Sequence, residues 1–367
     1  MKKNRLPIFS LLLATLLLAT ACNSKDNSTG ALVAPVEFHR FEQLIFSTPQ
    51  KQLRSVLASD SAICSSPLLN CYPDDPDYID YLGSFAHDPY MRYIYRKTDS
   101  LYRDLSWLER DLNEAMIKAH ELCPDIYYKH YYTLITADFE TGYDTRVFCY
   151  DRELAISIDH YALPAMKDHN YFMTPAYIVG LCTREHILPD CMSAVAIDHI
   201  TLPDGDLTLL DHAIYRGKIL YFLDQVLPDI PEHIKIRYTP EQLEWMKTNI
   251  KNVWGHLIQN NLLFSTDKGE LRNLIGEAPK TNAFGDGSAP RVCDYIGWQI
   301  VKSYMSHNKN VTLGNLLADT DSRKILNQSQ WRPEEEESSS SNLLLWLLLG
   351  GGIVAAIVIA WLLLRRK

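Results

Sequence analysis

Apolar segments at both ends of the chain restrict what it can fold into more than any other feature of the sequence. Residues 6–21 form one apolar run, directly after the basic start at residues 2–5. Residues 343–364 form the other, directly before the basic residues 365–367. As a helix, this second run is about 33 Å long, and a bilayer core is about 30 Å thick. The sequence therefore predicts one large domain held between two membrane-associated ends.

The N-terminal segment has the three parts of a secretory signal, namely a basic start, a short apolar run and small residues before a cleavage point. The small residues at positions 19–21 directly precede Cys22, as in a bacterial lipobox. We therefore predict a lipoprotein signal peptide over residues 1–21, lipidation of Cys22, and a flexible polar tether over residues 22–35. An uncleaved signal anchor is the alternative.

The C-terminal run predicts a transmembrane helix over residues 343–364, and membrane helices tolerate the glycines it contains. An acidic, Ser-rich linker over residues 334–342 precedes it. Basic residues mark the cytoplasmic side of a span, so residues 365–367 are expected in the cytoplasm and the main domain, residues 36–333, in the periplasm. We expect a lipid-anchored, single-span protein of the cell membrane. An α-helical span favours the inner over the outer membrane.

The charge balance of the chain is acidic, with 36 Lys and Arg against 45 Asp and Glu. Six of the basic residues lie in the two membrane-associated ends, so the main domain is more acidic than the whole chain. Such a surface excludes nucleic acid as a partner. Membrane lipid is the expected partner of Cys22 and of the C-terminal helix. The 21 tyrosines favour additional contacts with proteins.

The cysteines predict two disulfides. Of the eight cysteines, Cys22 is assigned to lipid, and the odd number that remains leaves at least one free thiol. Cys64 and Cys71 flank a loop and form the first predicted pair, and Cys182 and Cys191 form the second. Burial as free thiols is the alternative for several of them. No CxxC occurs, which argues against redox catalysis and a zinc ribbon.

Apolar periodicity predicts a mainly α protein with a small β-sheet. Helical spacing is found in residues 99–122, 185–197, 207–227, 240–263 and 297–305. Strands are predicted at residues 131–137, 146–150 and 154–159, with a turn at 151–153, and a strand or turn followed by a helix at 38–57. Residues 63–76 read as a loop, and Pro189 is expected to end or kink its helix.

The predicted order of elements, a helix, then strands, then further helices, is also that of the zincin metalloproteases. In those proteins the helix that carries HExxH comes after a small sheet. No HExxH occurs here, and no stretch supplies two histidines at helical spacing. We therefore predict no metal and no cofactor. A composite zinc site would have to combine residues from separate stretches: His186, Asp190, His199 and His212. Asp159 and His160, at a predicted strand end, form a weaker candidate site.

Several stretches resemble the gliding-motility lipoprotein family GldB. The longest is LTLLDHAIYRGKILYFLD at residues 207–224. The others also fall in family order, at residues 40–47, 227–228, 238–245, 261–265, 290–292, 296–304 and 325–329. This resemblance covers residues 38–333 and implies a role in gliding motility or the linked protein-secretion machinery, with envelope proteins as partners. If the organism does not glide, an envelope or secretion role is still implied.

The same stretches are similar to predicted zincin-type zinc proteases, in which a segment corresponding to residues 196–200 would carry HExxH and the position of Arg216 a ligating Glu. An arginine repels a metal cation. The resemblance thus implies a non-catalytic, zincin-like scaffold. The former active-site cleft would bind a partner through a groove formed by six residues: His186, Asp198, His199, His212, Tyr215 and Arg216. The alternatives are a zinc peptidase with a non-standard ligand set and a structural protein that only links envelope layers.

Overall fold

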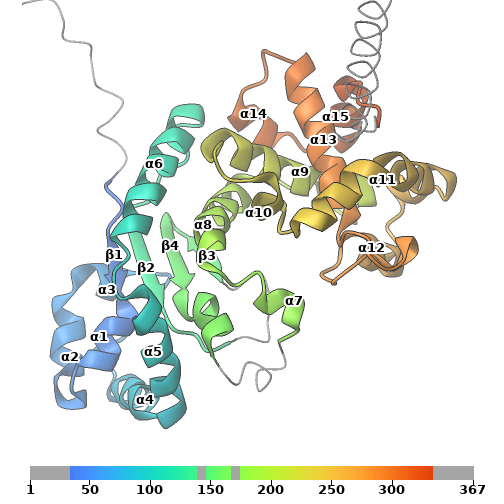
Figure 1. Ribbon diagram of the computed structural model, residues 1–367. Coiled ribbons are helices and arrows are strands. Elements are labelled where there is room, and N and C mark those ends of the chain that lie inside the picture. The colour runs from blue at the N-terminus through green and yellow to red at the C-terminus, as the bar shows by residue number, and fades with distance from the viewer. Residues whose placement is uncertain (1–33, 139–145, 167–173, 334–367) are drawn as a thin grey trace, which may run out of the picture.

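The computed structural model describes residues 34–138, 146–166 and 174–333 (Figure 1). The predicted signal peptide, the lipidation site Cys22, the linker, the C-terminal membrane helix and its basic tail all lie outside these residues. Within the described ranges, no helix combines the length and apolarity needed to span a membrane.

A four-stranded sheet has the order β1 (Phe38–Arg40), β2 (His130–Leu134), β4 (Glu153–Ser157) and β3 (Val147–Tyr150). The first three strands are parallel to one another, and β3 pairs antiparallel with β4 at one edge. All five residues of β4 are buried, as expected for a central strand. The three strands predicted beyond residue 130 and the strand at the start of the domain are confirmed.

The hairpin between β3 and β4 is tighter than predicted. Asp151 and Arg152 have φ values of 48° and 66°, and Glu153 already belongs to β4. Two successive residues with positive φ are typical of a type I′ turn, whose twist matches that of the flanking strands.

The helices before residue 103 lie around one end of the sheet, and the next helix extends toward the opposite end (Figure 1). They are α1 (Phe41–Ser47), α2 (Gln50–Ser59), α3 (Ser61–Ser65), α4 (Pro76–His87), α5 (Pro89–Tyr102) and α6 (Ser106–Leu122). Two expectations were wrong here. The predicted loop at 63–76 begins inside α3, and the helix predicted over 99–122 is interrupted after Tyr102. The Asp104 carboxylate accepts a hydrogen bond from Ser106 N at 2.9 Å and forms a local turn just before α6, whose N-cap residue is Leu105.

The helices after the sheet are α7 (Ala176–Val179), α8 (Arg184–His199), α9 (Leu209–Val226), α10 (Glu232–Ile236), α11 (Pro240–Gln259), α12 (Lys268–Ile275), α13 (Val292–His307), α14 (Leu313–Ala318) and α15 (Ser322–Ser329). Short 3₁₀ helices are found at η3 (Ile158–Ala165), η5 (Leu262–Phe264) and η6 (Asn282–Phe284). All four helices predicted in this part are confirmed, with ends shifted by a few residues. The mainly α class with a small sheet is also confirmed.

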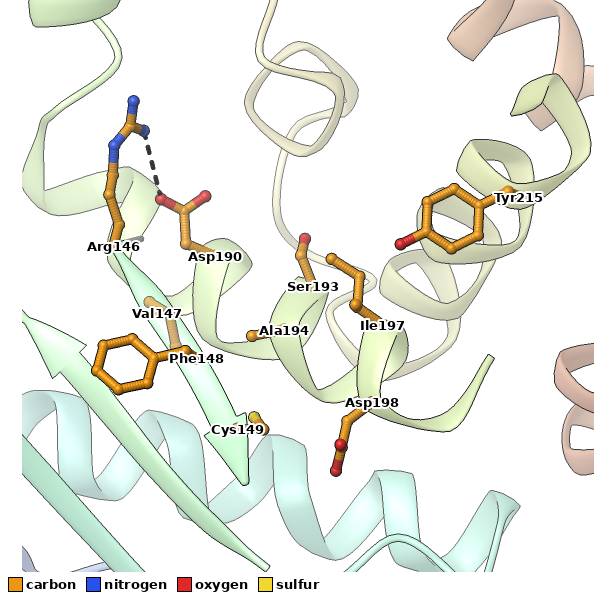
Figure 2. A pocket seen from close by; sticks show the side chains of 10 residues that line it. All are labelled: Arg146, Val147, Phe148, Cys149, Asp190, Ser193, Ala194, Ile197, Asp198 and Tyr215. Atoms are coloured by element: carbon orange, nitrogen blue, oxygen red, sulfur yellow. Dashed lines mark ion pairs between the residues drawn. The ribbon is translucent and has the colours of Figure 1, made fainter. Parts of the chain in front are cut away.

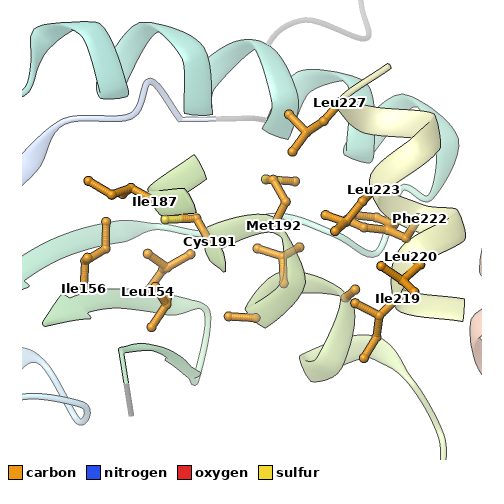
Figure 3. Packing of buried hydrophobic residues seen from close by; sticks show 14 of the residues in the cluster. Leu154, Ile156, Ile187, Cys191, Met192, Ile219, Leu220, Phe222, Leu223 and Leu227 are labelled. Carbon is orange, nitrogen blue, oxygen red and sulfur yellow. The ribbon is translucent and has the colours of Figure 1, made fainter. Parts of the chain in front are cut away.

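Helix α8 packs between β4 and α9 and forms the centre of the core (Figure 3). Its residues Ile187, Cys191 and Met192 contribute to the cluster that includes Leu154 of β4 and Leu223 of α9. A helix that is apolar on most sides is a buried one. This burial fixes the position of the few polar side chains that α8 carries.

Pro189 was predicted to end or kink its helix, and it does not end α8. The helix continues from Arg184 to His199 with Pro189 inside it. A proline removes one helical hydrogen bond, which here leaves the carbonyl of Glu185 without its usual donor. Glu185 is exposed, so water can hydrate that carbonyl, and packing against the core holds the rest of the helix.

Helices α9 and α13 cross at two glycines. A Cβ atom on Gly297 would lie 1.7 Å from the carbonyl oxygen of Ala213, and one on Gly217 would lie 2.3 Å from the carbonyl oxygen of Gly297. Only glycine permits backbones to approach so closely. This contact fixes the position of α9. The same helix carries Tyr215, which lines a cleft.

Candidate functional site

A cleft of about 310 Å³ lies between β3 and α8 (Figure 2). We call it the β3–α8 cleft. It is lined by Arg146, Val147, Phe148, Cys149, Asp190, Ser193, Ala194, Ile197, Asp198 and Tyr215. The first four precede or belong to β3, the next five belong to α8, and Tyr215 comes from α9. The Tyr215 hydroxyl is directed toward Ser193 and Ile197 in Figure 2.

The lining residues of α8 follow helical periodicity. Asp190, Ser193, Ala194 and Ile197 are three or four positions apart and therefore share one face of the helix. Other sides of α8 carry the core residues of Figure 3. Burial of those sides anchors the floor of the cleft to the core.

Buried charges occupy one end of the cleft. The Asp190 carboxylate forms an ion pair with Arg237, lies 3.9 Å from Arg146 Nη1, and accepts a hydrogen bond from Tyr161 Oη at 2.6 Å. Arg146 and Arg237 are 1% and 3% exposed. Burial raises the pKa of Asp190 to about 7, and the positive charge of Arg146 opposes that shift. Arg146 and Arg237 therefore both lie beside the Asp190 carboxylate at this buried end of the cleft.

The other end of the cleft carries the exposed carboxylate of Asp198. Tyr128 Oη donates a hydrogen bond to Asp198 Oδ2 at 2.7 Å, which fixes the side chain. Its nearest cationic partner is His199, whose Nδ1 lies 3.9 Å away and whose charge depends on protonation. The Asp198 end of the cleft therefore carries an exposed negative charge, whereas the charged groups at the Arg146 end are buried.

A second pocket of about 240 Å³ lies beyond Tyr215, which lines both spaces. Its other residues are His212, Arg216, Ile275, Glu277, Arg291 and Asp294. The buried carboxylate of Asp294 pairs with Arg216 Nε at 3.2 Å and with Arg291 Nε at 3.3 Å. This pocket contains internally balanced charges and a carboxylate that is 1% exposed.

The six predicted groove residues are divided between these spaces. Asp198 and Tyr215 line the β3–α8 cleft, and His212, Tyr215 and Arg216 line the second pocket. His186 and His199 line neither. His186 Nδ1 lies 2.7 Å from Thr183 Oγ1 at the buried start of α8. His199 Nδ1 lies 3.0 Å from the Val195 carbonyl at the other end of the helix.

Sequence reasoning missed Arg146, Ser193, Ala194 and Ile197 as cleft residues and treated Asp190 only as a metal ligand. It placed the functional segment of the helix at residues 196–200, whereas the face of α8 toward the cleft begins at Asp190. The polar or small residues at positions 190, 193 and 194 interrupt an otherwise apolar helix, and that interruption was the available signal.

The composite zinc site is not assembled. His186 and His199 stand at opposite ends of α8, about 20 Å apart at 1.5 Å per residue, which is too far to share an ion. In the part of the chain that the structure describes, no group of three or more His, Cys, Asp and Glu residues is placed to hold a metal. Arg216, at the position suggested for a third ligand, is committed to Asp294.

The two predicted disulfides are not formed, and the seven cysteines of the described residues are free thiols. Cys64 Sγ donates to the Leu57 carbonyl at 3.0 Å, and burial raises the pKa of the Cys71 thiol to about 11. Cys182 Sγ donates to the Ile178 carbonyl at 3.3 Å, whereas Cys191 is buried in the core on α8.

Asp159 and His160 are buried structural residues at the end of β4. Ala137 N donates to the Asp159 carboxylate at 2.8 Å, and Thr136 Oγ1 lies 3.3 Å from His160 Nε2. Burial raises the pKa of Asp159 to about 7 and lowers the pKa of His160 to about 4. Neither residue lines the β3–α8 cleft.

Comparison with known proteins identifies one family. Residues 22–333 match the family model described as gliding motility protein GldB, and this match begins at the predicted lipidation site. No curated protein and no solved structure matches the chain. The chain therefore belongs to the GldB family of gliding-motility-associated lipoproteins, which confirms that resemblance. The similarity to zincin proteases remains a prediction.

Proposed function

We propose that this member of the GldB family is a non-catalytic envelope lipoprotein that binds a partner protein of the motility or linked secretion machinery in the β3–α8 cleft. One observation carries the proposal. The cleft combines apolar surface at Ala194 and Ile197 with polar groups at its two ends, namely the buried Arg146 and Asp190 at one and the exposed Asp198 at the other. Protein interfaces also surround an apolar centre with polar groups that fix the partner's orientation.

The rigidity of the cleft supports a docking role. Its floor belongs to α8, whose other face is buried against β4 and α9. Ile197 is 38% exposed although the helix around it is core, so the cleft offers apolar surface to a partner. A preorganised surface binds at a smaller entropic cost than one that must be ordered first.

The ion pairs at the second pocket support a non-catalytic role. Arg216 and Arg291 both pair with Asp294, and Arg291 also pairs with Glu277. These carboxylates are neutralised by arginines and therefore have little tendency to bind a cation. The arrangement suits a zincin-like scaffold that works by binding, and the zinc peptidase alternative receives no support from it.

The proposed location follows from the two ends of the sequence. Lipidation of Cys22 and a span at residues 343–364 would hold the domain on the periplasmic side of the inner membrane. Envelope proteins of the motility machinery would then meet the cleft at that surface.

The proposal is tested in cells with a variant whose larger side chain fills the cleft. Ala194 is 8% exposed on the cleft floor, so Ala194→Trp places a large ring where the partner would lie. Ile117→Trp is the matched control, because Ile117 is 41% exposed on α6 and does not line the cleft. Each variant is expressed in a strain lacking the gene, and membrane levels and colony spreading are measured.

We expect Ile117→Trp to restore spreading and Ala194→Trp to fail at the same membrane level. In an organism that does not glide, export of secreted proteins is the readout. Full activity of Ala194→Trp would contradict the proposal.

A further inference from the structure

A pocket of about 450 Å³ lies between α11, α13 and the chain that follows α15. We call it the α11–α13 pocket, and it shares no residue with the β3–α8 cleft. Its lining consists of Lys247 and Ile250 of α11, Tyr295, Gln299, Ser303 and His307 of α13, and Gln330, Trp331 and Arg332. Residues near the end of the described chain therefore form part of its wall.

The path of the chain after α15 is fixed at this pocket. Ser303 Oγ donates a hydrogen bond to the Ser329 carbonyl at 2.7 Å, and Gln330 turns the chain with a φ of 53°. The ring of Trp331 then packs edge-on against that of Trp254, with the ring centroids 5.1 Å apart. The chain beyond residue 333 therefore starts beside the pocket.

The charges at the α11–α13 pocket favour an anion. Its lining contains three basic side chains and no carboxylate. Glu232 of α10, which does not line it, pairs with Lys247 at 3.0 Å and with Lys302 at 3.5 Å, so two lysines share one carboxylate. Arg332 is exposed and has no ion pair within the residues that the structure describes. Three permanently positive side chains thus accompany one carboxylate, and an acidic occupant complements them.

One side chain of the lining also has an unused hydrogen-bond donor. Gln299 Nε2 is buried and finds no acceptor among the described residues. A buried donor without an acceptor destabilises the fold. A carboxylate in the pocket would supply that acceptor.

We propose that the four glutamates at residues 334–337, which lie outside the described residues, bind in the α11–α13 pocket. The first of them is two residues from Arg332 and lies within about 7 Å of it, and all four lie within about 18 Å. Because the acidic stretch is tethered at the pocket, its effective concentration there is high. Its carboxylates pair with Lys247 and Arg332 and accept a hydrogen bond from Gln299. This inference is independent of partner binding in the β3–α8 cleft.

Binding of the acidic stretch would shorten the link to the predicted membrane helix at residues 343–364. The nine linker residues 334–342 span up to about 30 Å when extended, whereas the five residues 338–342 span about 17 Å. The stretch therefore acts as a strap that holds the α11 and α13 side of the domain close to the membrane.

The contact is tested with a carbodiimide, which joins a carboxylate to an amine without a spacer. The full chain in non-ionic detergent is treated and digested, and the joined peptides are identified by mass spectrometry. We expect residues 334–337 to be joined to Lys247 about fivefold more often than to Lys309, which is exposed but does not line the pocket. In about 1 M salt the coupling to Lys247 should fall severalfold, because the Debye length shortens to about 3 Å.

Two results of this experiment would overturn the proposal. One is equal coupling of residues 334–337 to Lys247 and Lys309. The other is the absence of coupling to Lys247 in a sample in which Lys247 is joined to Glu232, because that product shows that the reagent reaches the pocket.

The role of charge is tested by protection from a glutamate-specific protease. Binding in the pocket shields residues 334–337, so Lys247→Gln should speed cleavage there about two- to fivefold, the effect of one partly exposed ion pair. Lys309→Gln is the matched control, because it removes the same charge outside the lining and should leave the rate unchanged. Thermal melting checks that both variants are folded. Equal cleavage rates in the two variants would contradict binding in the pocket.

The alternative occupant is the phosphate group of an anionic lipid. The carbodiimide experiment is therefore repeated with the full chain in vesicles of phosphatidylglycerol and in vesicles of phosphatidylcholine. We expect the same coupling of residues 334–337 to Lys247 in both. Loss of the coupling in phosphatidylglycerol alone would show that the lipid headgroup takes the pocket, and it would overturn the proposal.

Discussion

The α9–α13 crossing and the β3–α8 cleft both involve the central helices, yet they are built in opposite ways. At the crossing, a Cβ on Gly297 would lie 1.7 Å from a backbone oxygen, so no space is left. At the cleft, β3 and α8 leave about 310 Å³ between them and carry charges at both ends. The comparison shows that tight backbone contact on one side of the core allows the other side to remain open.

The two regions also differ in what holds them. The crossing combines close backbone contact with an ion pair between Arg216 of α9 and Asp294 of α13, whereas the Arg146 end of the cleft depends on a buried cluster around Asp190. Buried ion pairs contribute little net stability, because desolvation offsets their attraction. Their presence beside the cleft is better explained by binding than by folding.

The largest expected effect is at the crossing. Gly297→Ala would force α9 and α13 apart, and we expect it to lower the free energy of unfolding by more than about 3 kcal/mol. Gly255→Ala is the control in α11, where a Cβ meets only Gln259 Nε2 at 4.0 Å. It should stabilise the protein by up to about 1 kcal/mol, because alanine favours helix. Urea unfolding measures both, and equal effects would refute the close contact.

Removing the Asp190 carboxylate should have the next largest effect. Asp190→Ala leaves Arg146 and Arg237 buried without their carboxylate, which typically costs about 3–5 kcal/mol. Ser193→Ala, on the same face of α8, should change stability by less than about 1 kcal/mol. Urea unfolding measures both variants. If Asp190→Ala were as stable as the unchanged protein, the cluster would be hydrated in solution.

The pH dependence of stability should separate Asp159 from His160. The folded protein keeps Asp159 protonated up to about pH 7, above the ordinary value of 3.8, so its contribution to stability falls as pH rises from 4 to 7. His160 stays neutral in the folded protein down to about pH 4, below the ordinary 6.5, so its contribution rises over that interval.

Single substitutions of Asp159 and His160 should therefore change the slope of stability against pH in opposite directions. Between pH 4 and pH 6.5, Asp159→Asn should make the slope of stability against pH more positive, and His160→Gln should make it more negative. Thermal melts of both variants across this range provide the measurement. Slopes that change in the same direction would contradict the opposite pKa shifts of Asp159 and His160.

A smaller effect is expected at the start of α9, which carries Tyr215 to the cleft. Thr208 and Asp211 form a capping box there. Thr208→Ala should cost about 1 kcal/mol. In Thr248→Ala, the control in α11, the lost hydroxyl bonds only the Glu244 carbonyl, and we expect a change below about 0.5 kcal/mol. A cost at Thr248 that equals the cost at Thr208 would contradict the capping role.

Sequence alone predicted the elements better than their arrangement. The alternating residues of β4 and the apolar periodicity of α8 and α9 are local signals, and the structure confirms these elements. The break after Tyr102 was missed because the apolar spacing continues across it, whereas the turn at Asp104 depends on one side chain. Pro189 does not end its helix, because core packing around α8 outweighs one lost hydrogen bond.

The cleft was predicted only in part. Asp198 and Tyr215 were found, because they belong to conspicuous polar stretches of two helices. Arg146 was missed as a site residue, since its relation to Asp190 exists only after β3 has joined the sheet beside α8. The histidines were predicted as site residues because imidazole is a common ligand and catalytic group. In the structure, His186 and His199 instead make local contacts with Thr183 and Val195.

The most direct test of the account is site-specific photocrosslinking in living cells. A photoreactive amino acid replaces Ile197 in the β3–α8 cleft or, as the control, Ile258, which is 49% exposed on α11. We predict one discrete protein adduct from position 197 that disappears when Ala194→Trp is added, and no such adduct from position 258. Absence of an adduct at position 197, or the same adduct from both positions, would contradict docking in the cleft.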